Sequence, residues 1–311
     1  MFQEILQTIQ SFDTIILHRH GRPDGDAIGS QVGMQQILLE NFPEKRVYMV
    51  GDNPGFYGFI EGSQMDEIPD STYEGALAII LDCGSKSMVN DDRYQMAAKT
   101  IRFDHHIFCE KIADLEVVDT SFESCCGLVT EFAVQCGLKL NHLASRALFT
   151  GMITDSGRFR YDSTNSRTFR LASRLMEQNI DTNELYRTLY ADDFSSKLLK
   201  AKFILKISFT QNNVAYIYTT REELEELNAD TFTVSRGMVG TMSDTKGVDI
   251  WVNFTETEKG VLCELRSSKY NINPIAVKYG GGGHAKASGA TVADKATAMA
   301  MLADLDAMIG E

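Results

Sequence analysis

The sequence has little that would tie it to a membrane, an oxidising compartment or a long polyanion. No stretch approaches the roughly 18 apolar residues that a membrane-spanning helix needs, and the start, MFQEILQTIQ, lacks the basic and apolar regions of a secretory signal. The six cysteines form no Cys-x-x-Cys pair and no disulfide spacing, which favours a reducing cytoplasm. With 30 Lys and Arg against 43 Asp and Glu, the net charge of −13 repels long nucleic acid. An anionic substrate should therefore be short, with local cations to bind it.

The 311 residues are enough for two domains with separate cores. Short apolar runs alternate with helical stretches in the first half, and continuous runs such as ALAIIL indicate strands covered on both faces. We expect an α/β domain over residues 1–190, with a mostly parallel sheet and helices on both faces. A connecting helix over 191–207 then leads to a smaller α+β domain over 208–311. The expected strands of the first domain are Thr14–His18, Arg46–Val50, Ala76–Leu81, Lys99–Phe103 and Glu116–Val118.

The second half carries runs of β-branched and aromatic residues with rough alternation, which predict strands. These runs are VAYIYTT, VDIWVNFTE and VLCELRSS. Helical patterns separate and follow them, over Arg221–Leu227, Asn273–Tyr279 and Asp294–Ile309.

Acidic and imidazole side chains follow three of the expected strands of the first domain. Because the carboxyl ends of parallel strands meet at one edge, where ligands bind in open α/β sheets, we expect these side chains to converge. Taken singly, each motif has an ordinary explanation, such as a turn, a helix N-cap or a surface histidine. The residues are His20, Asp24 and Asp26 after the first strand, Asp82 after the third, Asp104, His105 and His106 after the fourth, and Asp155 after an apolar helical stretch.

Carboxylates and imidazoles without thiolates are the ligands of a borderline-hard divalent ion. Mn²⁺ suits them, with Mg²⁺ or Co²⁺, and also Fe²⁺ or Zn²⁺, as alternatives. Two ions about 4 Å apart would neutralise the carboxylates, activate a water and stabilise the attacking and leaving oxygens of a phosphoryl transfer. The residues therefore predict a two-metal phosphoesterase.

Five motifs occur in order: HGRPDGDAIGS, LDCG, FDHH, TDSGRF and GGGGHAKASG. This set resembles the DHH phosphoesterase family, in the subfamily with a C-terminal DHHA1 domain, and the likeness spans nearly the whole chain. Within the family it resembles the nanoRNase/pAp phosphatase type, which cleaves very short oligonucleotides and 3′-phosphoadenosine 5′-phosphate (pAp). The resemblance leaves three alternatives: a phosphodiesterase of linear or cyclic dinucleotides, a pyrophosphatase or polyphosphatase, and a non-catalytic nucleotide-binding protein.

The resemblance also implies a role for each clustered residue. Asp82 bridges the two metal ions, and His106 lies beside the scissile phosphate as a hydrogen-bond donor or acid. Asp104 is implied to orient the histidines by hydrogen bonding without binding a metal ion itself. Ile107 stands where the family often has proline, a departure that touches no ligand. One metal is implied to bind His20, Asp24 and Asp82, and the other Asp26, Asp82, His105 and Asp155.

The second domain is implied to hold the substrate. A run of glycines allows close backbone approach to an anion, although a flexible turn explains it equally well. Arg158 in the first domain either reaches the phosphate or forms a structural ion pair. The expected partner is a short RNA or small nucleotide, and a homodimer is the candidate assembly. The substrate-binding candidates are Gly281, Gly282, Gly283, His284, Arg266, Ser267 and Ser268, and the candidates for base stacking are Phe159, Tyr161 and Tyr279.

Overall fold

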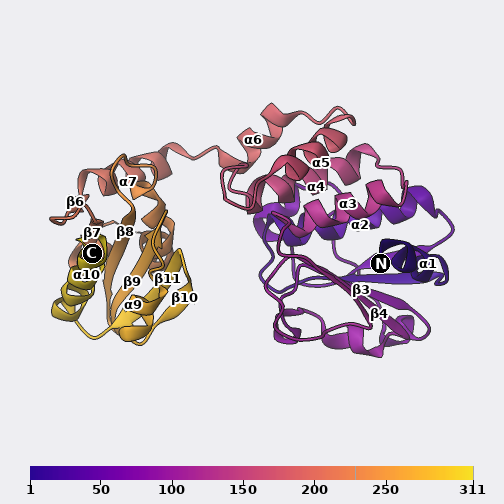
Figure 1. The fold of residues 1–311 in the computed structure, drawn as a ribbon, viewed down its shortest axis with the longest axis horizontal. Coiled ribbons are helices and arrows are strands. Elements are labelled where there is room, and N and C mark those ends of the chain that lie inside the picture. Colours follow the sequence, from indigo (N-terminus) through magenta and orange to yellow (C-terminus); the bar gives the residue numbers. More distant parts are fainter. Residues whose placement is uncertain (228, 311) are drawn as a thin grey trace. The chain divides into compact units, whose positions relative to one another are not determined.

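The computed structural model describes residues 1–227 and 229–310, which form two compact units. One unit covers Met1–Leu189 and the other begins at Tyr190 (Figure 1). Within the described residues, no helix has the length and apolar character needed to cross a membrane.

The first unit is built on a five-stranded sheet in which all strands run parallel. Its order is β2-β1-β3-β4-β5, so the chain passes from β2 on one side of β1 to β3 on the other side. The apolar runs predicted all five strands to within one residue at each end. The strands are β1 (Thr14–His18), β2 (Arg46–Met49), β3 (Leu77–Leu81), β4 (Lys99–Asp104) and β5 (Leu115–Val118).

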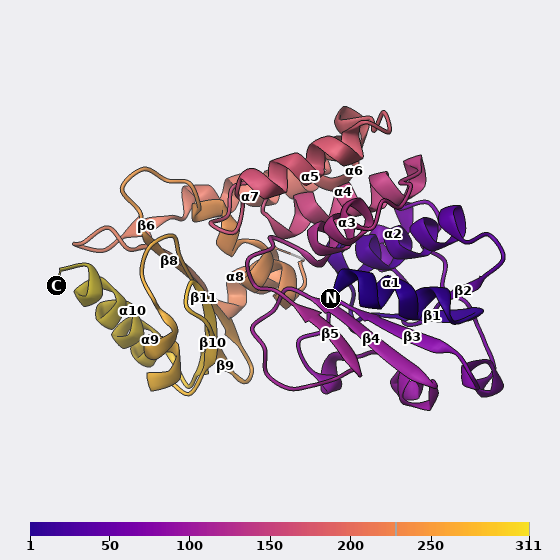
Figure 2. The same ribbon diagram turned by 45° about the vertical axis from the view of Figure 1, so that its right-hand side comes forward.

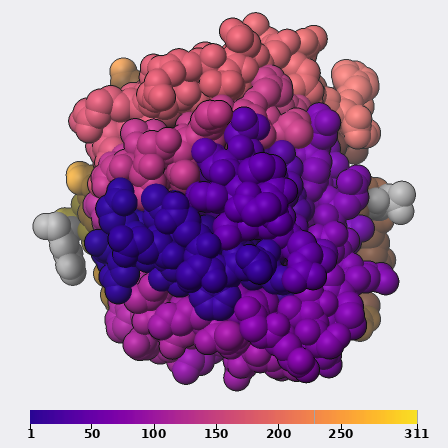
Figure 3. Space-filling model, turned by 90° about the vertical axis from the view of Figure 1, so that its right-hand side faces the viewer, coloured from indigo at the N-terminus to yellow at the C-terminus, as the bar shows by residue number. Residues whose placement is uncertain are grey.

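Helices cover both faces of this sheet, as expected, but they differ in kind. Alternate strand residues such as Ile15 and Leu17 pack into the main core with the α-helices, whereas Ile16 faces a smaller core under short 3₁₀ helices. The N-terminal segment lies at the surface of this unit (Figure 3), where the Phe2 ring packs 5.6 Å from that of Phe132. The α-helices are α1 (Phe2–Gln10), α2 (Gly25–Asn41), α3 (Cys125–Gln135), α4 (His142–Asp155), α5 (Ser166–Met176) and α6 (Thr182–Tyr190), and the 3₁₀ helices are η1 (Gly55–Phe59), η2 (Asp70–Tyr73), η3 (Lys86–Met88) and η4 (Asp92–Met96).

Helices α2 and α4 pack closely and antiparallel because glycines line their interface. A Cβ at Gly29 would lie 2.5 Å from the carbonyl oxygen of Ala147, and one at Gly25 would lie 2.4 Å from Oγ1 of Thr154. The start of α2 is thereby held beside the end of α4. This packing brings together two segments that carry predicted ligands.

The second unit contains a six-stranded mixed sheet in the order β10-β11-β9-β8-β7-β6. Figure 2 shows this sheet with helix α10 beside it. Strands β7 and β8 pair in parallel and all other neighbours pair antiparallel. The strands are β6 (Ser208–Phe209), β7 (Ala215–Thr219), β8 (Ile250–Thr257), β9 (Gly260–Ser267), β10 (Gly282–His284) and β11 (Ala287–Val292), and the helices are α7 (Phe194–Leu205), α8 (Arg221–Glu226), η5 (Thr233–Gly237), η6 (Val239–Met242), α9 (Asn273–Lys278) and α10 (Lys295–Gly310).

This second sheet has a core on each face. Side chains of α9 and α10 fill one core, and Phe203 of α7 lies in the other with residues of η5 and η6. Helix α7, which we expected as a connector, thus packs into the second unit.

The glycine run requires a correction, because part of it forms a strand where the sequence pattern predicted none. Gly282–His284 form the edge strand β10, paired antiparallel with β11, and His284 lies opposite Ala287. Glycine, alanine and serine disfavour strands or indicate them weakly, so the sequence pattern did not show this hairpin. Backbone pairing with β11 holds it instead.

Candidate metal centre

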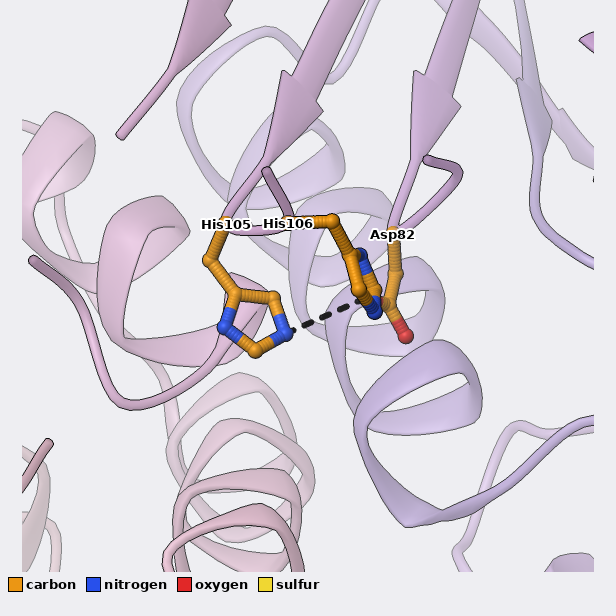
Figure 4. Close-up of side chains that lie close together, drawn as sticks. All are labelled: Asp82, His105 and His106. Carbon is orange, nitrogen blue, oxygen red and sulfur yellow. Dashed lines mark ion pairs between the residues drawn. The ribbon is translucent and has the colours of Figure 1, made fainter. Parts of the chain in front are cut away.

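The predicted ligands converge at the carboxyl ends of three neighbouring strands, β1, β3 and β4. The sheet order reverses between β1 and β3, and ligands of open α/β sheets bind at such a reversal. Figure 4 shows Asp82 at the end of one strand and both histidines at the end of its neighbour, with the His105 ring directed toward Asp82.

His20 is oriented with one ring nitrogen toward the acidic residues. Its Nδ1 lies 2.8 Å from the carbonyl oxygen of Gly21. A carbonyl only accepts, so Nδ1 carries a proton, and Nε2 offers a lone pair when the imidazole is neutral. That Nε2 lies 3.4 Å from Asp82 Oδ2 and 3.8 Å from Asp24 Oδ1. Asp24 is itself fixed as the N-cap of α2, since its Oδ1 accepts from the amides of Asp26 and Ala27.

Asp26 is held by the N-terminus of α3. Its two carboxylate oxygens accept hydrogen bonds from the backbone amides of Cys125 and Cys126, at 2.7 and 2.8 Å. A helix N-terminus favours a negative charge, so this contact compensates part of the burial of a carboxylate that is 1% exposed.

His105 links three carboxylates. Its Nε2 lies 3.7 Å from Asp26 Oδ2, 3.6 Å from Asp82 Oδ1 and 3.3 Å from Asp155 Oδ2. These residues come from α2, the loop after β3, and the end of α4. A single imidazole nitrogen thus faces oxygens delivered by three separate segments.

Asp82 has an unusual backbone and an unpartnered oxygen. Its φ of 57° lies in the left-handed region, which costs energy for a residue other than glycine and clusters at functional sites. The side chain is buried, and its Oδ1 accepts no hydrogen bond. An unsatisfied buried carboxylate oxygen is expensive unless a cation neutralises it.

The carboxylates of the cluster raise one another's pKa values, as expected of negative charges held close together. Burial, then the charges of Asp82 and Asp155, raise the pKa of Asp26 well above its usual value. Burial raises the pKa of Asp155 to about 7, with Asp82 and Asp24 adding to the shift against the effect of His105. Burial disfavours protonation of His20, yet its contacts with Asp24 and Asp82 raise its pKa to about 10.

Divalent metal ions fit this donor set. Three groups could each hold an ion with ligand atoms within 4.8 Å of one another. Nearby thiols do not compete, because burial raises the pKa values of Cys83, Cys125 and Cys126 and each Sγ contacts a backbone carbonyl. Carboxylate and imidazole donors remain. The groups are His20, Asp24 and Asp82; Asp26, His105 and Asp155; and Asp82, His105 and His106.

His106 belongs to a hydrogen-bonded chain that runs back into the sheet. Its Nδ1 lies 2.7 Å from Asp104 Oδ1, and Arg102 donates to the other oxygen of Asp104 at 2.5 Å. Arg102 is fully buried and also donates to the carbonyls of Gly84 and Glu110. The contact with Asp104 raises the pKa of His106 against the effect of burial.

Arg158 and the expected stacking residues of this unit lie beyond the end of α4. Arg158 is exposed, with a φ of 64°. Burial raises the pKa of Tyr186, and the charge of Arg158 opposes that shift. Phe159 is engaged with other rings, with centroids 5.9 Å from Phe149 and 5.5 Å from Phe169. Tyr161 is exposed, and its ring lies against Gly157.

In the second unit, the predicted substrate residues gather around β9 and the β10–β11 hairpin. Arg266 lies opposite Ala287 and forms an ion pair with Glu264 at 3.1 Å. Ser267 is buried, and its hydroxyl donates to the Asp249 carbonyl and accepts from two amides. Ser268 and His284 are exposed. The Tyr279 hydroxyl of this unit donates to Asp304.

The glycines of the hairpin differ in whether the fold has room for a side chain at their position. A Cβ at Gly281 would lie 2.1 Å from the Gly289 carbonyl oxygen, and one at Gly283 would lie 2.6 Å from that of Ala287. Gly283 also has a φ of 133°. Gly282 meets nothing within 4 Å and has no positive φ. The fold therefore explains Gly281 and Gly283 but not Gly282.

Sequence reasoning missed three features of this centre. Arg102 could have been found, since it is a charged residue within the apolar run KTIRF. The α3 amides that hold Asp26 are backbone groups and carry no residue signal. Tyr57 lies against Gly25, with a Cβ there 2.9 Å from its Cε1, yet it comes from a distant loop.

Two family models match the chain. That of the DHH family, N-terminal domain, matches residues 14–153, and that of the DHHA1 domain matches residues 213–311. A bifunctional oligoribonuclease and PAP phosphatase NrnA from Bacillus subtilis is 35% identical over 100% of this chain and 99% of its own. A probable bifunctional oligoribonuclease and PAP phosphatase NrnA from Streptococcus mutans is 36% identical over 93% of each chain.

A solved structure agrees with the fold. An exopolyphosphatase-related protein from Bacteroides fragilis matches with a TM-score of 0.86, covering 100% of this chain and 97% of its own. At 24% identity, this likeness shows the fold alone. The two domain matches and the full-length relatives assign the chain: it belongs to the DHH family, with a DHH N-terminal domain followed by a DHHA1 domain.

Proposed function

We propose that this protein is a metal-dependent phosphoesterase that hydrolyses short oligoribonucleotides and pAp. The observation that carries the proposal is the unpartnered Oδ1 of Asp82, buried where carboxylates and imidazoles from four segments meet. The full-length relatives named oligoribonuclease and PAP phosphatase support this substrate class. The reaction breaks a P–O bond by attack of water.

We assign two divalent ions to the centre, with Mn²⁺ as the expected metal and Mg²⁺ or Co²⁺ as alternatives. Asp82 is the shared ligand, because its two oxygens face His20 and His105 separately. Such ions supply Lewis acidity at phosphoryl oxygens and lower the pKa of water. One ion is assigned to His20, Asp24 and Asp82, and the other to Asp26, Asp82, His105 and Asp155.

We assign His106 to the substrate. Its Nδ1 is engaged by Asp104, which leaves Nε2 to donate to a phosphate oxygen or the leaving oxygen. Asp104 cannot turn away, because Arg102 holds its other oxygen. Arg158 remains a candidate contact for the phosphate at the same end of α4.

The second unit is proposed to bind the remainder of the substrate through Arg266, Ser268, His284 and the glycine hairpin. Gly282 is the glycine that the fold does not require, so its bare backbone is the expected point of approach for an anion. Ser267 contributes by holding the turn after β9.

We further propose that the enzyme is cytoplasmic, since all six cysteines are free. A homodimer stays a prediction, which sedimentation can check.

A substrate panel tests the proposal. RNAs from dinucleotide to pentanucleotide, pAp, pApA, cyclic di-AMP and pyrophosphate are assayed in Mn²⁺, with metal content measured on the same sample. We expect turnover of pAp and of the short RNAs. If the metal is bound and none of these is hydrolysed, the proposal fails. Pyrophosphate turned over far faster than pAp would instead assign the protein to the pyrophosphatases.

A further inference from the structure

Three aromatic side chains of η1 form a surface beside the metal centre. They are Phe56, Tyr57 and Phe59, which we call the η1 shelf. Phe56 contacts both of the others, with ring centroids 5.2 Å from Tyr57 and 5.8 Å from Phe59. The Phe56 ring meets each of these rings edge to face, an arrangement that aromatic pairs prefer.

The shelf adjoins the centre through Tyr57. A Cβ at Gly25 would lie 2.9 Å from Cε1 of Tyr57, so this ring touches the residue between Asp24 and Asp26. Burial, followed by the charges of Asp24 and Asp155, raises the pKa of Tyr57. The hydroxyl therefore lies within the field of two predicted metal ligands.

The three rings differ in whether they pack against the core of the first unit. Tyr57 and Phe59 pack against the main core, and the guanidinium of Arg146 lies 5.8 Å from the centre of the Phe59 ring. Phe56 is not part of that core and is 62% exposed. Two anchored rings thus hold a third, which presents an apolar surface that the fold does not use.

The chemistry of the surroundings limits what can cover Phe56. The adjacent centre is lined by carboxylates and is expected to hold cations, so it takes the phosphate of the substrate. The part of a nucleotide that is flat and uncharged is its base, which the ribose places a short distance from the phosphate. Aromatic side chains are the usual platforms for such bases.

We propose that Phe56 stacks on the base of the nucleotide whose phosphate occupies the metal centre. This inference rests on the proposed function and deepens it by naming a contact for the base. Every base has a π face, so stacking tolerates sequence. The enzyme should therefore need a base at this position without selecting which one.

Kinetics of Phe56→Ala test the stacking contact. We expect KM for pAp to rise about 5- to 150-fold, the range that loss of one stacked base gives, with kcat nearly unchanged. A bisphosphate of the same sugar without adenine should be hydrolysed equally by parent and variant. Phe56→Tyr should restore the KM of the parent. Phe209→Ala is the matched control, since Phe209 is 52% exposed on β6 of the other unit.

An unchanged KM for pAp in Phe56→Ala overturns the proposal. So does an equal loss for the base-free substrate, because Phe56 would then pack against protein, either elsewhere in this chain or in a second copy.

A binding measurement keeps this test separate from catalysis. The chain has one tryptophan, so Phe56→Trp adds a reporter at the shelf that is compared with Phe209→Trp. AMP should quench the new fluorescence at position 56, whereas ribose 5-phosphate should not. Equal quenching by both ligands, or none by either, overturns the inference. If the metal-loaded parent hydrolyses neither pAp nor the short RNAs while AMP still quenches, the proposed function fails and the base site stands.

Discussion

Asp82 combines a strained backbone, near-complete burial and an unpartnered oxygen in one residue. Each feature is unfavourable for the folded protein in the absence of cations. A residue kept under these conditions is typical of a site where stability has been given up for function. The strain and the missing partner both become explicable if Asp82 bridges two ions.

The variant Asp82→Asn should therefore stabilise the metal-free protein. In chelator we expect its midpoint of thermal unfolding to rise by about 2–4 °C, the shift that 1 kcal/mol gives in a unit of this size. The reason is that the substitution removes one of four clustered carboxylates, and asparagine tolerates the left-handed backbone. In Mn²⁺ the order should reverse, with metal content falling in the variant. Asp92→Asn, an exposed acid on η4, is the control. Equal Mn²⁺ content in parent and Asp82→Asn would contradict the shared-ligand assignment.

His106 should prove separable from the metal ligands. His106→Ala is expected to lower kcat roughly 10²- to 10⁴-fold, as loss of an acid–base group does, while metal content stays that of the parent. Asp104→Asn should give a smaller loss, since the imidazole remains but its orientation is no longer fixed. Single-turnover rates with metal analysis on each sample check both. Loss of a bound ion in His106→Ala would make His106 a ligand, as its grouping with Asp82 and His105 allows.

At the level of elements, the close packing of α2 against α4 sets the position of Asp26 relative to Asp155. Gly151→Ala tests this, because a Cβ there would lie 2.2 Å from Cys126 Sγ and 2.9 Å from Asp26 Oδ1. Alanine favours a helix over glycine by about 0.8–1.0 kcal/mol. We nevertheless expect the free energy of unfolding to fall, by up to about 2 kcal/mol, because overpacking costs more. Activity should fall with it. Gly240→Ala in η6, with open space around it, is the control for denaturant melts.

The β10 hairpin separates structural glycines from the one proposed to meet substrate. Gly282→Ala should leave the unfolding midpoint unchanged and raise KM for pAp, because the fold has room for the methyl group. Gly283→Ala should destabilise the second unit by about 1–3 kcal/mol, the cost of a strained φ. Thermal melts of both variants measure the change in stability, and steady-state kinetics measure the change in KM for pAp. If Gly282→Ala leaves KM unaltered, no anion approaches the backbone there.

Strand positions and strand-end ligands were readable from the sequence, whereas contacts that depend on packing were not. The apolar runs ending at His18 and Leu81 showed where each strand stops, and parallel topology then required His20 and Asp82 to meet. The hydrogen bond from the Cys125 amide to Asp26 joins residues 99 positions apart. Because its donor is a backbone group, no residue type in the sequence indicates it. The β10 strand was missed because glycine lacks the side chains that indicate a strand. The η1 shelf was likewise not predictable, because it depends on the packing of η1 against the start of α2.

For the whole molecule, the net charge of −13 bears on which substrates can reach the centre. Each added phosphate of a longer RNA meets a repulsive field unless basic residues line its path. Proteins that bind long nucleic acid behave in the opposite way, and their affinity falls steeply as salt rises. The two cases thus predict opposite signs for the effect of salt.

We expect kcat/KM to fall as RNA lengthens from a dinucleotide to about two dozen residues, and salt to reduce that fall. Raising salt from about 0.01 to 0.1 M shortens the Debye length from about 30 to about 10 Å, so repulsion of distant phosphates weakens. A long oligomer with uncharged methylphosphonate linkages beyond its terminal phosphodiester is the control, because it keeps length and removes charge. It should be cleaved nearly as well as the dinucleotide. A long RNA whose cleavage is fast in low salt and declines as salt rises would instead reveal a basic path for polyanions.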